Sequence, residues 1–221
     1  DVLKFYRETY EGTDFDQSRN LLVKKRNSDE LSRSPVASNW LSRDWINLIN
    51  TLKPGTIQPQ RTIAIMGCSY ATVIQIKGWL PPAVGAVCWF AFDNPALSPR
   101  IPIFAGTTEL PPGFDICAQH RYREDSAAWI FRRTNRLAGL RWGENRQLME
   151  ETVRVFEEKG FSDLPPIEKK ALEIINSKNP EKEPFNLNQY LTAYTGDFAR
   201  AALQKYRELY ELFWTRYARG I

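Results

Sequence analysis

The block from residue 62 to residue 105 constrains the fold more than any other feature of the chain. Short runs of β-branched or aromatic residues alternate there with glycine and proline, a pattern that predicts β-strands. The separators Pro81-Pro82 and Asp93-Asn94-Pro95 are typical of turns and leave hairpin-like distances between the runs, so we predict antiparallel pairing. The four predicted strands are Thr62–Met66, Ala71–Ile76, Val84–Phe92 and Ile101–Ala105.

The run Val84–Phe92 is apolar almost throughout. A strand with one wet face would alternate apolar and polar residues, so this composition favours a strand covered on both faces. We therefore predict that the sheet lies between other layers of the protein.

The two flanks of this block differ in character. We predict a helix over residues 1–12, ended by Gly12, and then a long irregular connection over residues 13–60. Strands are expected within residues 61–106 and helices within residues 123–221, all in one domain of the α+β class. The helices are expected at Arg123–Leu140, Glu144–Lys159, Pro165–Asn176 and Asp197–Arg219, the last with an apolar stripe through Phe198, Ala202, Tyr206, Leu209, Phe213 and Tyr217.

Composition argues against several classes of protein. The net charge of +4 comes from 30 basic and 26 acidic residues mixed along the chain, which favours neither a nucleic-acid partner nor a membrane surface. The three cysteines have no CxxC spacing, and His120 is the single histidine. We therefore expect no metal centre, no organic cofactor and no Ser-His-Asp triad.

Few residues stand out as chemical groups. Arg61 opens the first predicted strand, where it would serve either as a surface ion-pair partner or as a binder of a carboxylate or oxyanion. The Cys68-Ser69-Tyr70 cluster has potential nucleophiles without a neighbouring base, which favours a turn at a strand end. Trp79 and Trp89 lie in aromatic-rich runs that fit either a subsite wall or a core.

Motifs in a fixed order carry a family resemblance. Four further stretches accompany YRETYEGTDFD, which begins at Tyr6, and REDSAAW, which begins at Arg123. They are RTIAIMGCSY from Arg61, GWLPP from Gly78 and GAVCWFAFDNP from Gly85, followed by PIFAGTTELP from Pro102. In this order and spacing they resemble the dipeptidase A family of cysteine peptidases over about residues 1 to 142.

The resemblance implies an N-terminal-nucleophile αββα sandwich, in which two antiparallel sheets lie between helical layers. In such enzymes a Cys at the mature N-terminus attacks the peptide bond and its own α-amino group accepts the proton, so no histidine is needed. This sequence begins at Asp1 and none of its cysteines matches that position. We therefore expect the C-terminal half of a dipeptidase, inactive alone, with the nucleophile outside this chain.

The resemblance also suggests site residues. Arg61 matches an arginine of the family motif and is a candidate oxyanion or substrate contact, and Tyr70 and Lys77 are candidate substrate contacts. At Lys77 the family pattern has an arginine, and lysine keeps the charge but loses the bidentate geometry. We expect no catalytic nucleophile, cofactor or metal ligand within this chain.

The expected partners are the missing N-terminal half and small peptide substrates, and a homo-oligomer is compatible with the sequence. The alternative function is a catalytically inactive scaffold or protein-interaction module derived from the same fold. No signal-peptide pattern follows Asp1, which favours the cytoplasm, whereas a signal on the missing N-terminus would direct the protein to the periplasm or outside the cell.

Overall fold

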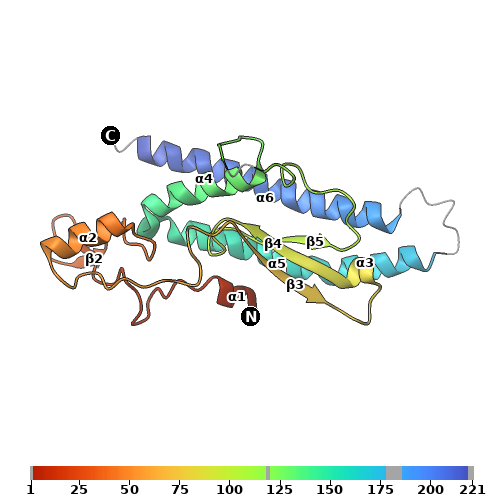
Figure 1. The fold of residues 1–221 in the computed structure, drawn as a ribbon, viewed down its shortest axis with the longest axis horizontal. Helices are drawn as coiled ribbons and strands as arrows, with labels where there is room; N and C mark the ends of the chain where they lie inside the picture. Colours follow the sequence, from red (N-terminus) through yellow and green to blue (C-terminus); the bar gives the residue numbers. More distant parts are fainter. Residues whose placement is uncertain (1, 118–119, 178–185, 219–221) are drawn as a thin grey trace.

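Long helices flank a small central sheet, and a hairpin with a short helix lies at one end of the molecule (Figure 1). The structure is a computed structural model that describes residues 2–117, 120–177 and 186–218. In chain order the elements are α1 (Val2–Tyr6), β1 (Leu22–Lys24), β2 (Leu31–Arg33), α2 (Arg43–Leu52), β3 (Tyr70–Ile76), α3 (Pro82–Gly85), β4 (Ala86–Phe92), β5 (Ile101–Phe104), α4 (Ala127–Leu140), α5 (Trp142–Ile175) and α6 (Leu187–Ala218).

The central sheet has the strand order β3-β4-β5, and both of its pairings are antiparallel. The antiparallel arrangement and the α+β class predicted from the sequence are thereby confirmed. The predicted strand Val84–Phe92 begins later, because residues Pro82–Gly85 form the short helix α3. Gly85 allows the tight return of the chain, since a Cβ atom there would lie 2.8 Å from the carbonyl oxygen of Lys77.

The predicted strand Thr62–Met66 is wrong, because this segment is irregular. Its backbone bonds to parts of the chain other than a neighbouring strand. The amide of Ala64 donates to the carbonyl oxygen of Glu8 at 3.0 Å, and the indole of Trp40 donates to the carbonyl oxygen of Ala64 at 2.8 Å. Backbone contacts with Glu8 and Trp40 thus take the place of strand pairing in this segment.

The irregular connection predicted over residues 13–60 is also corrected. It contains the two-stranded hairpin β1–β2 and the ten-residue helix α2. Ser42 caps this helix, since its hydroxyl oxygen accepts a hydrogen bond from the amide of Trp45 at 3.3 Å. The hairpin turn includes Asn27 at a φ of 61°, a conformation that asparagine tolerates better than most residues.

The N-terminal helix is shorter than predicted. It ends at Tyr6, and both Tyr10 (φ 61°) and Gly12 (φ 77°) adopt the left-handed conformation. In the C-terminal half of the chain, α4 begins at Ala127, four residues later than the predicted start at Arg123. The last helix, α6, begins at Leu187, ten residues earlier than the predicted start at Asp197. The predicted last residue, Arg219, lies outside the described residues.

The two helices predicted at Glu144–Lys159 and Pro165–Asn176 form one continuous helix, α5. A proline inside a helix removes a backbone hydrogen bond and costs roughly 3 kcal/mol, so Pro165 and Pro166 suggested a break. Leu164 and Ile167 on either side of them are buried in the core. Tertiary packing on this face therefore outweighs the local preference of the prolines.

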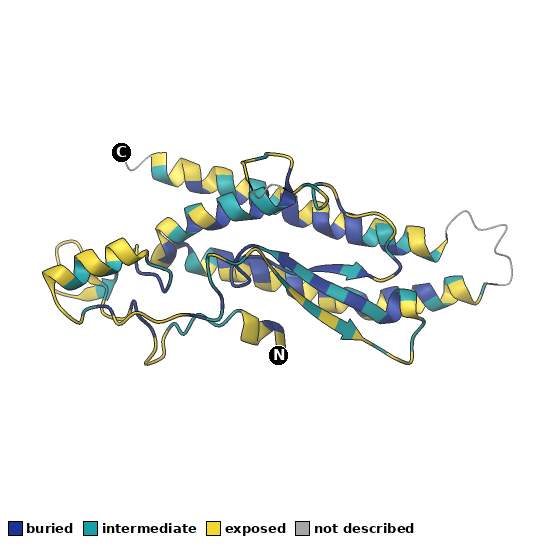
Figure 2. Cartoon of the chain, viewed as in Figure 1, coloured by how far each residue is buried: buried dark blue, intermediate teal, exposed yellow. Residues whose placement is uncertain are grey.

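Two clusters of buried side chains form the core. One joins α4, α6 and the first half of α5, and it includes the predicted stripe of α6 from Phe198 to Phe213. The other lies between one face of the sheet and the second half of α5, with Trp89 at its centre. Figure 2 shows that burial is concentrated between the helices and the sheet, whereas the hairpin end is largely exposed.

Candidate functional site

A buried carboxylate marks the end of β4. Asp93 follows the last residue of that strand, is 1% exposed, and adopts a positive φ of 60° as the chain turns. Its side chain accepts two hydrogen bonds from α4: Arg132 Nε donates to Oδ1 and Asn135 Nδ2 donates to Oδ2, each at 3.0 Å. The backbone amide of Asp93 donates to the carbonyl oxygen of Ser69 at 2.9 Å, which ties the turn to the start of β3.

Arg132 connects this buried carboxylate to the surface. Its guanidinium is about one third exposed, and its Nη2 lies 3.4 Å from the carbonyl oxygen of Cys68. A guanidinium has five N–H donors, so donors remain after these two contacts. Because the Asp93 carboxylate holds it in place, Arg132 can present a fixed fork of donors to an oxyanion or a carboxylate at the surface.

Asn135 is the buried member of the group. Its amide nitrogen also donates to the hydroxyl oxygen of Ser98 at 2.9 Å, while its Oδ1 has no hydrogen-bond partner among the described residues. The bonds to Asp93 and Ser98 fix the orientation of the Asn135 amide inside the protein. We call Asp93, Arg132 and Asn135 the strand-end cluster.

The internal cysteines near this cluster lack the features of a nucleophile. The thiol of Cys68 lies 3.2 Å from the carbonyl oxygen of Tyr70, and burial raises its pKa, with Asp93 adding to the rise and Arg132 opposing it. Burial also raises the pKa of Cys88 on β4. Because the thiolate is the attacking species, a raised pKa makes both thiols poor nucleophiles near neutral pH.

The residues predicted from the sequence as site contacts do not gather in one place. Tyr70 is 61% exposed at the start of β3, beside the strand-end cluster, with its ring stacked on Phe90 at a centroid distance of 5.7 Å. Lys77 follows the other end of β3, about 23 Å away at the rise of an extended strand, and it pairs with Glu168. Arg61 is exposed and has no hydrogen bond or ion pair within the described part of the chain.

Sequence reasoning missed the strand-end cluster. The sequence predicts that Asp93 is part of a turn, which it is, but a carboxylate directly after a buried strand also places a charge where the sheet ends. Arg132 and Asn135 lie three residues apart on α4, so they share a helix face. That spacing of a guanidinium and an amide on one face of an otherwise amphipathic helix is the signal that could have identified them.

One face of the sheet lies open beside the cluster. The side chains of β3 alternate, and those on this face are exposed, as Tyr70, Ile74 and Ile76 illustrate. The partner residues on β4 that share the face, among them Cys88 and Phe90, are half-buried. At the end of β4, the rings of Phe114 and Phe131 pack against Phe92 and cover that end of the face. We call this surface, formed by Tyr70, Thr72, Ile74 and Ile76 with Cys88 and Phe90, the open sheet face.

Within the described ranges, no three His, Cys, Asp or Glu side chains gather in a way that could hold a metal ion. None of the helices described there is both long and apolar enough to cross a lipid bilayer.

Comparisons with known proteins identify a family for the chain. No curated protein matches the sequence. A family model described as peptidase family C69 matches residues 1–155, which is more than half of the chain and includes β3, β4, β5, α4 and the strand-end cluster. This match confirms the resemblance to dipeptidase A cysteine peptidases and implies the N-terminal-nucleophile fold. The chain belongs to peptidase family C69.

Proposed function

We propose that this chain is the C-terminal part of a cysteine dipeptidase whose N-terminal Cys nucleophile lies on a segment outside these 221 residues. Membership of peptidase family C69 supports a cysteine peptidase of the dipeptidase type. The observation that carries the proposal further is the open sheet face. Its β3 side exposes apolar residues such as Ile74 and Ile76. An apolar sheet surface is rarely left in water, and a sandwich of two sheets would cover it.

The location of the open sheet face favours this arrangement over a sheet that is simply solvated. The opposite face of the same sheet is covered by α5, so a second sheet would complete an αββα order of layers. β3 is also an edge strand in the order β3-β4-β5, so one of its edges is unpaired within the described part of the chain. Both the face and the edge are thus free to contact the segment that carries the nucleophile.

The reaction would then proceed as acyl transfer to sulfur. The Cys thiol gives its proton to its own α-amino group, and the sulfur attacks the peptide carbonyl carbon to form a C–S bond and an oxyanion. Collapse of this intermediate breaks the C–N bond, and the leaving amine takes the proton from the α-ammonium. Water then hydrolyses the thioester, which releases the acid and restores the thiol.

In this reaction we assign Arg132 to the substrate, with Asp93 and Asn135 as its positioning residues. Its free donors suit either the oxyanion or the terminal carboxylate of a dipeptide. Tyr70, beside it, is proposed as a wall of the substrate site, and Arg61 remains a proposed contact. The ion pair of Lys77 with Glu168, at the far end of β3, does not support a substrate role for that residue.

The test uses the longest product that the reading frame containing this chain encodes. Intact mass determines whether the mature chain begins with Cys, and hydrolysis of a set of dipeptides measures activity. We expect an N-terminal Cys, loss of activity on its change to Ala, and full inactivity of the 221-residue chain. Arg132→Gln should lower kcat/KM by about tenfold or more, with Arg132→Lys recovering part of it.

Arg121→Gln is a matched control, because Arg121 is an exposed arginine outside the strand-end cluster. If the mature product has no N-terminal Cys and hydrolyses no dipeptide, the enzyme proposal is wrong and the scaffold or interaction module predicted as the alternative is favoured.

A further inference from the structure

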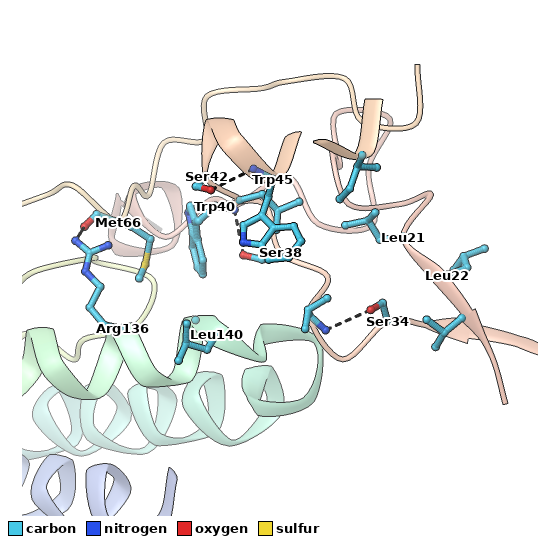
Figure 3. Close-up of a pocket in the computed structure, with 15 residues that line it drawn as sticks. Leu21, Leu22, Ser34, Ser38, Trp40, Ser42, Trp45, Met66, Arg136 and Leu140 are labelled. Carbon is cyan, nitrogen blue, oxygen red and sulfur yellow. Dashed lines mark hydrogen bonds between the residues drawn. The ribbon is translucent and has the colours of Figure 1, made fainter. Parts of the chain in front are cut away.

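The described part of the chain contains an apolar groove that the proposed reaction does not use. It has a volume of about 610 Å³ and lies between the β1–β2 hairpin, α2 and the C-terminal end of α4. Figure 3 shows its labelled walls: Leu21 and Leu22 near the hairpin, Trp40 and Trp45 at α2, and Leu140 with Arg136 on α4. A volume of this size is in the range of small-molecule sites.

The polar side chains that line this groove, three serines and Arg136, can all donate hydrogen bonds. The hydroxyl oxygens of Ser34, Ser38 and Ser42 each accept a backbone amide, at 3.4, 3.1 and 3.3 Å, so their hydroxyl hydrogens remain to donate. Arg136 uses Nη2 on the carbonyl oxygen of Met66 and keeps its other donors. None of the described residues that line the groove is acidic.

We propose that the groove binds an apolar molecule with a single carboxylate, such as an alkyl carboxylate, with its chain along Trp40, Trp45 and Leu140 and its charge at Arg136. A carboxylate would receive the donors that the groove offers, and the apolar walls would receive the chain. This site is distinct from the strand-end cluster. It lies beyond Arg136, one helical turn from Arg132 on α4.

The same chemistry argues against a dipeptide in this groove. A dipeptide is zwitterionic, and its α-ammonium would lose water without finding an acidic partner in the lining. A molecule that has a carboxylate but no cationic group therefore fits the groove better than a dipeptide does. This inference does not rest on the proposed peptidase reaction, since it concerns equilibrium binding alone.

The test is a titration of the full-length product with decanoate, in which tryptophan fluorescence and calorimetry each measure the binding. We expect saturable binding with one site per chain. Arg136→Gln should weaken decanoate binding by about tenfold or more, because a charge-assisted hydrogen bond is lost, and should leave the binding of neutral 1-decanol unchanged. Arg136→Lys should give an intermediate affinity, since it keeps the charge but not the fork.

Matched variants separate the groove from other apolar surfaces. Trp45→Ala should weaken both decanoate and 1-decanol, whereas Trp79→Ala, which changes another exposed tryptophan outside the groove, should weaken neither. Circular dichroism of each variant reports whether the fold is kept.

Three outcomes would overturn the proposal. The first is no saturable binding of decanoate to folded wild-type protein. The second is equal affinity of wild type and Arg136→Gln for decanoate. The third is displacement of decanoate by leucyl-phenylalanine at comparable concentration, which would make the groove a peptide site. A protein that lacks peptidase activity but binds decanoate in the expected manner would leave this proposal intact.

Discussion

The two faces of the β3-β4-β5 sheet are built from equally apolar residues, yet the helices cover one of them and leave much of the other exposed. Trp89, on the covered face, is 1% exposed, whereas Ile74, on the open face, is 67% exposed. On β3, Val73 and Ile74 are neighbours in sequence and point to opposite faces. The difference teaches that composition alone does not say which apolar face a chain can cover by itself.

The covered face is completed by close packing. A Cβ atom at Gly160 of α5 would lie 2.9 Å from the Trp89 ring, so this glycine allows the helix to approach the sheet. Phe161 packs on the same ring at a centroid distance of 4.6 Å, and the indole donates to Gln75 at 3.0 Å. On the open face, Phe92 and Ile101 pack against the cluster of α4 and α6, whereas the exposed side chains of β3 have no comparable layer within the described residues. We therefore expect substitutions on the two faces to differ in free energy.

The largest difference is expected between two tryptophans. Trp89→Ala removes a fully buried indole and should lower the free energy of unfolding by about 3 to 5 kcal/mol. Trp79→Ala changes a side chain that is 80% exposed, so it should stay within about 0.5 kcal/mol of wild type. Urea denaturation followed by far-UV circular dichroism measures both. Equal losses in the two variants would contradict the assignment of the covered face.

A smaller difference is expected between the neighbours on β3. Val73→Lys places a charge against the helix layer and should cost about 2 kcal/mol or more, although the lysine stem can reach partly toward water. Ile74→Lys keeps its charge in solvent and should change the stability of this chain by about 0.5 kcal/mol at most.

Ile74→Lys also tests what the open face does. We expect the 221-residue chain to self-associate through this apolar surface, and the variant to sediment more nearly as a monomer. In the full-length product the same variant should destabilise the fold, because a covering sheet would bury the lysine. If Ile74→Lys leaves the free energy of unfolding unchanged in both proteins, no layer covers the open face and the proposed sandwich is incorrect.

The sequence predicted the elements whose signal is local. The β-branched and aromatic runs between glycine and proline identified β3, β4 and β5, and the apolar stripe from Phe198 to Phe213 identified the second half of α6. The prediction failed where contacts between residues far apart in the sequence determine the structure. Residues 62–66 have strand composition but bond to Glu8 and Trp40, and the prolines of α5 are accommodated by the burial of their neighbours.

The candidate site was harder to predict for a similar reason. The cluster joins Asp93 with Arg132 and Asn135, about forty residues away, and no spacing rule connects a strand end to a helix face at that distance. Motif and position suggest Arg61, Tyr70 and Lys77. The pairing of β3 with β4 places Tyr70 beside the cluster and Lys77 beyond the far end of the strand. Sequence identifies charged residues, whereas tertiary pairing decides which of them share a site.

The smallest expected effect is a difference in the rate at which a cysteine on the open face is alkylated. Cys88 lies opposite Ile74 on β4 and is half-buried, and burial raises the pKa of its thiol. Alkylation by iodoacetamide at pH 8 should therefore be several-fold slower at Cys88 than at the exposed Cys117, and it should accelerate as the pH rises and more thiolate forms. Peptide mass spectrometry gives the rate at each cysteine. In the full-length product a covering sheet should almost abolish labelling of Cys88 and leave that of Cys117 unchanged, so an unchanged rate at Cys88 would mean that this face stays open to solvent.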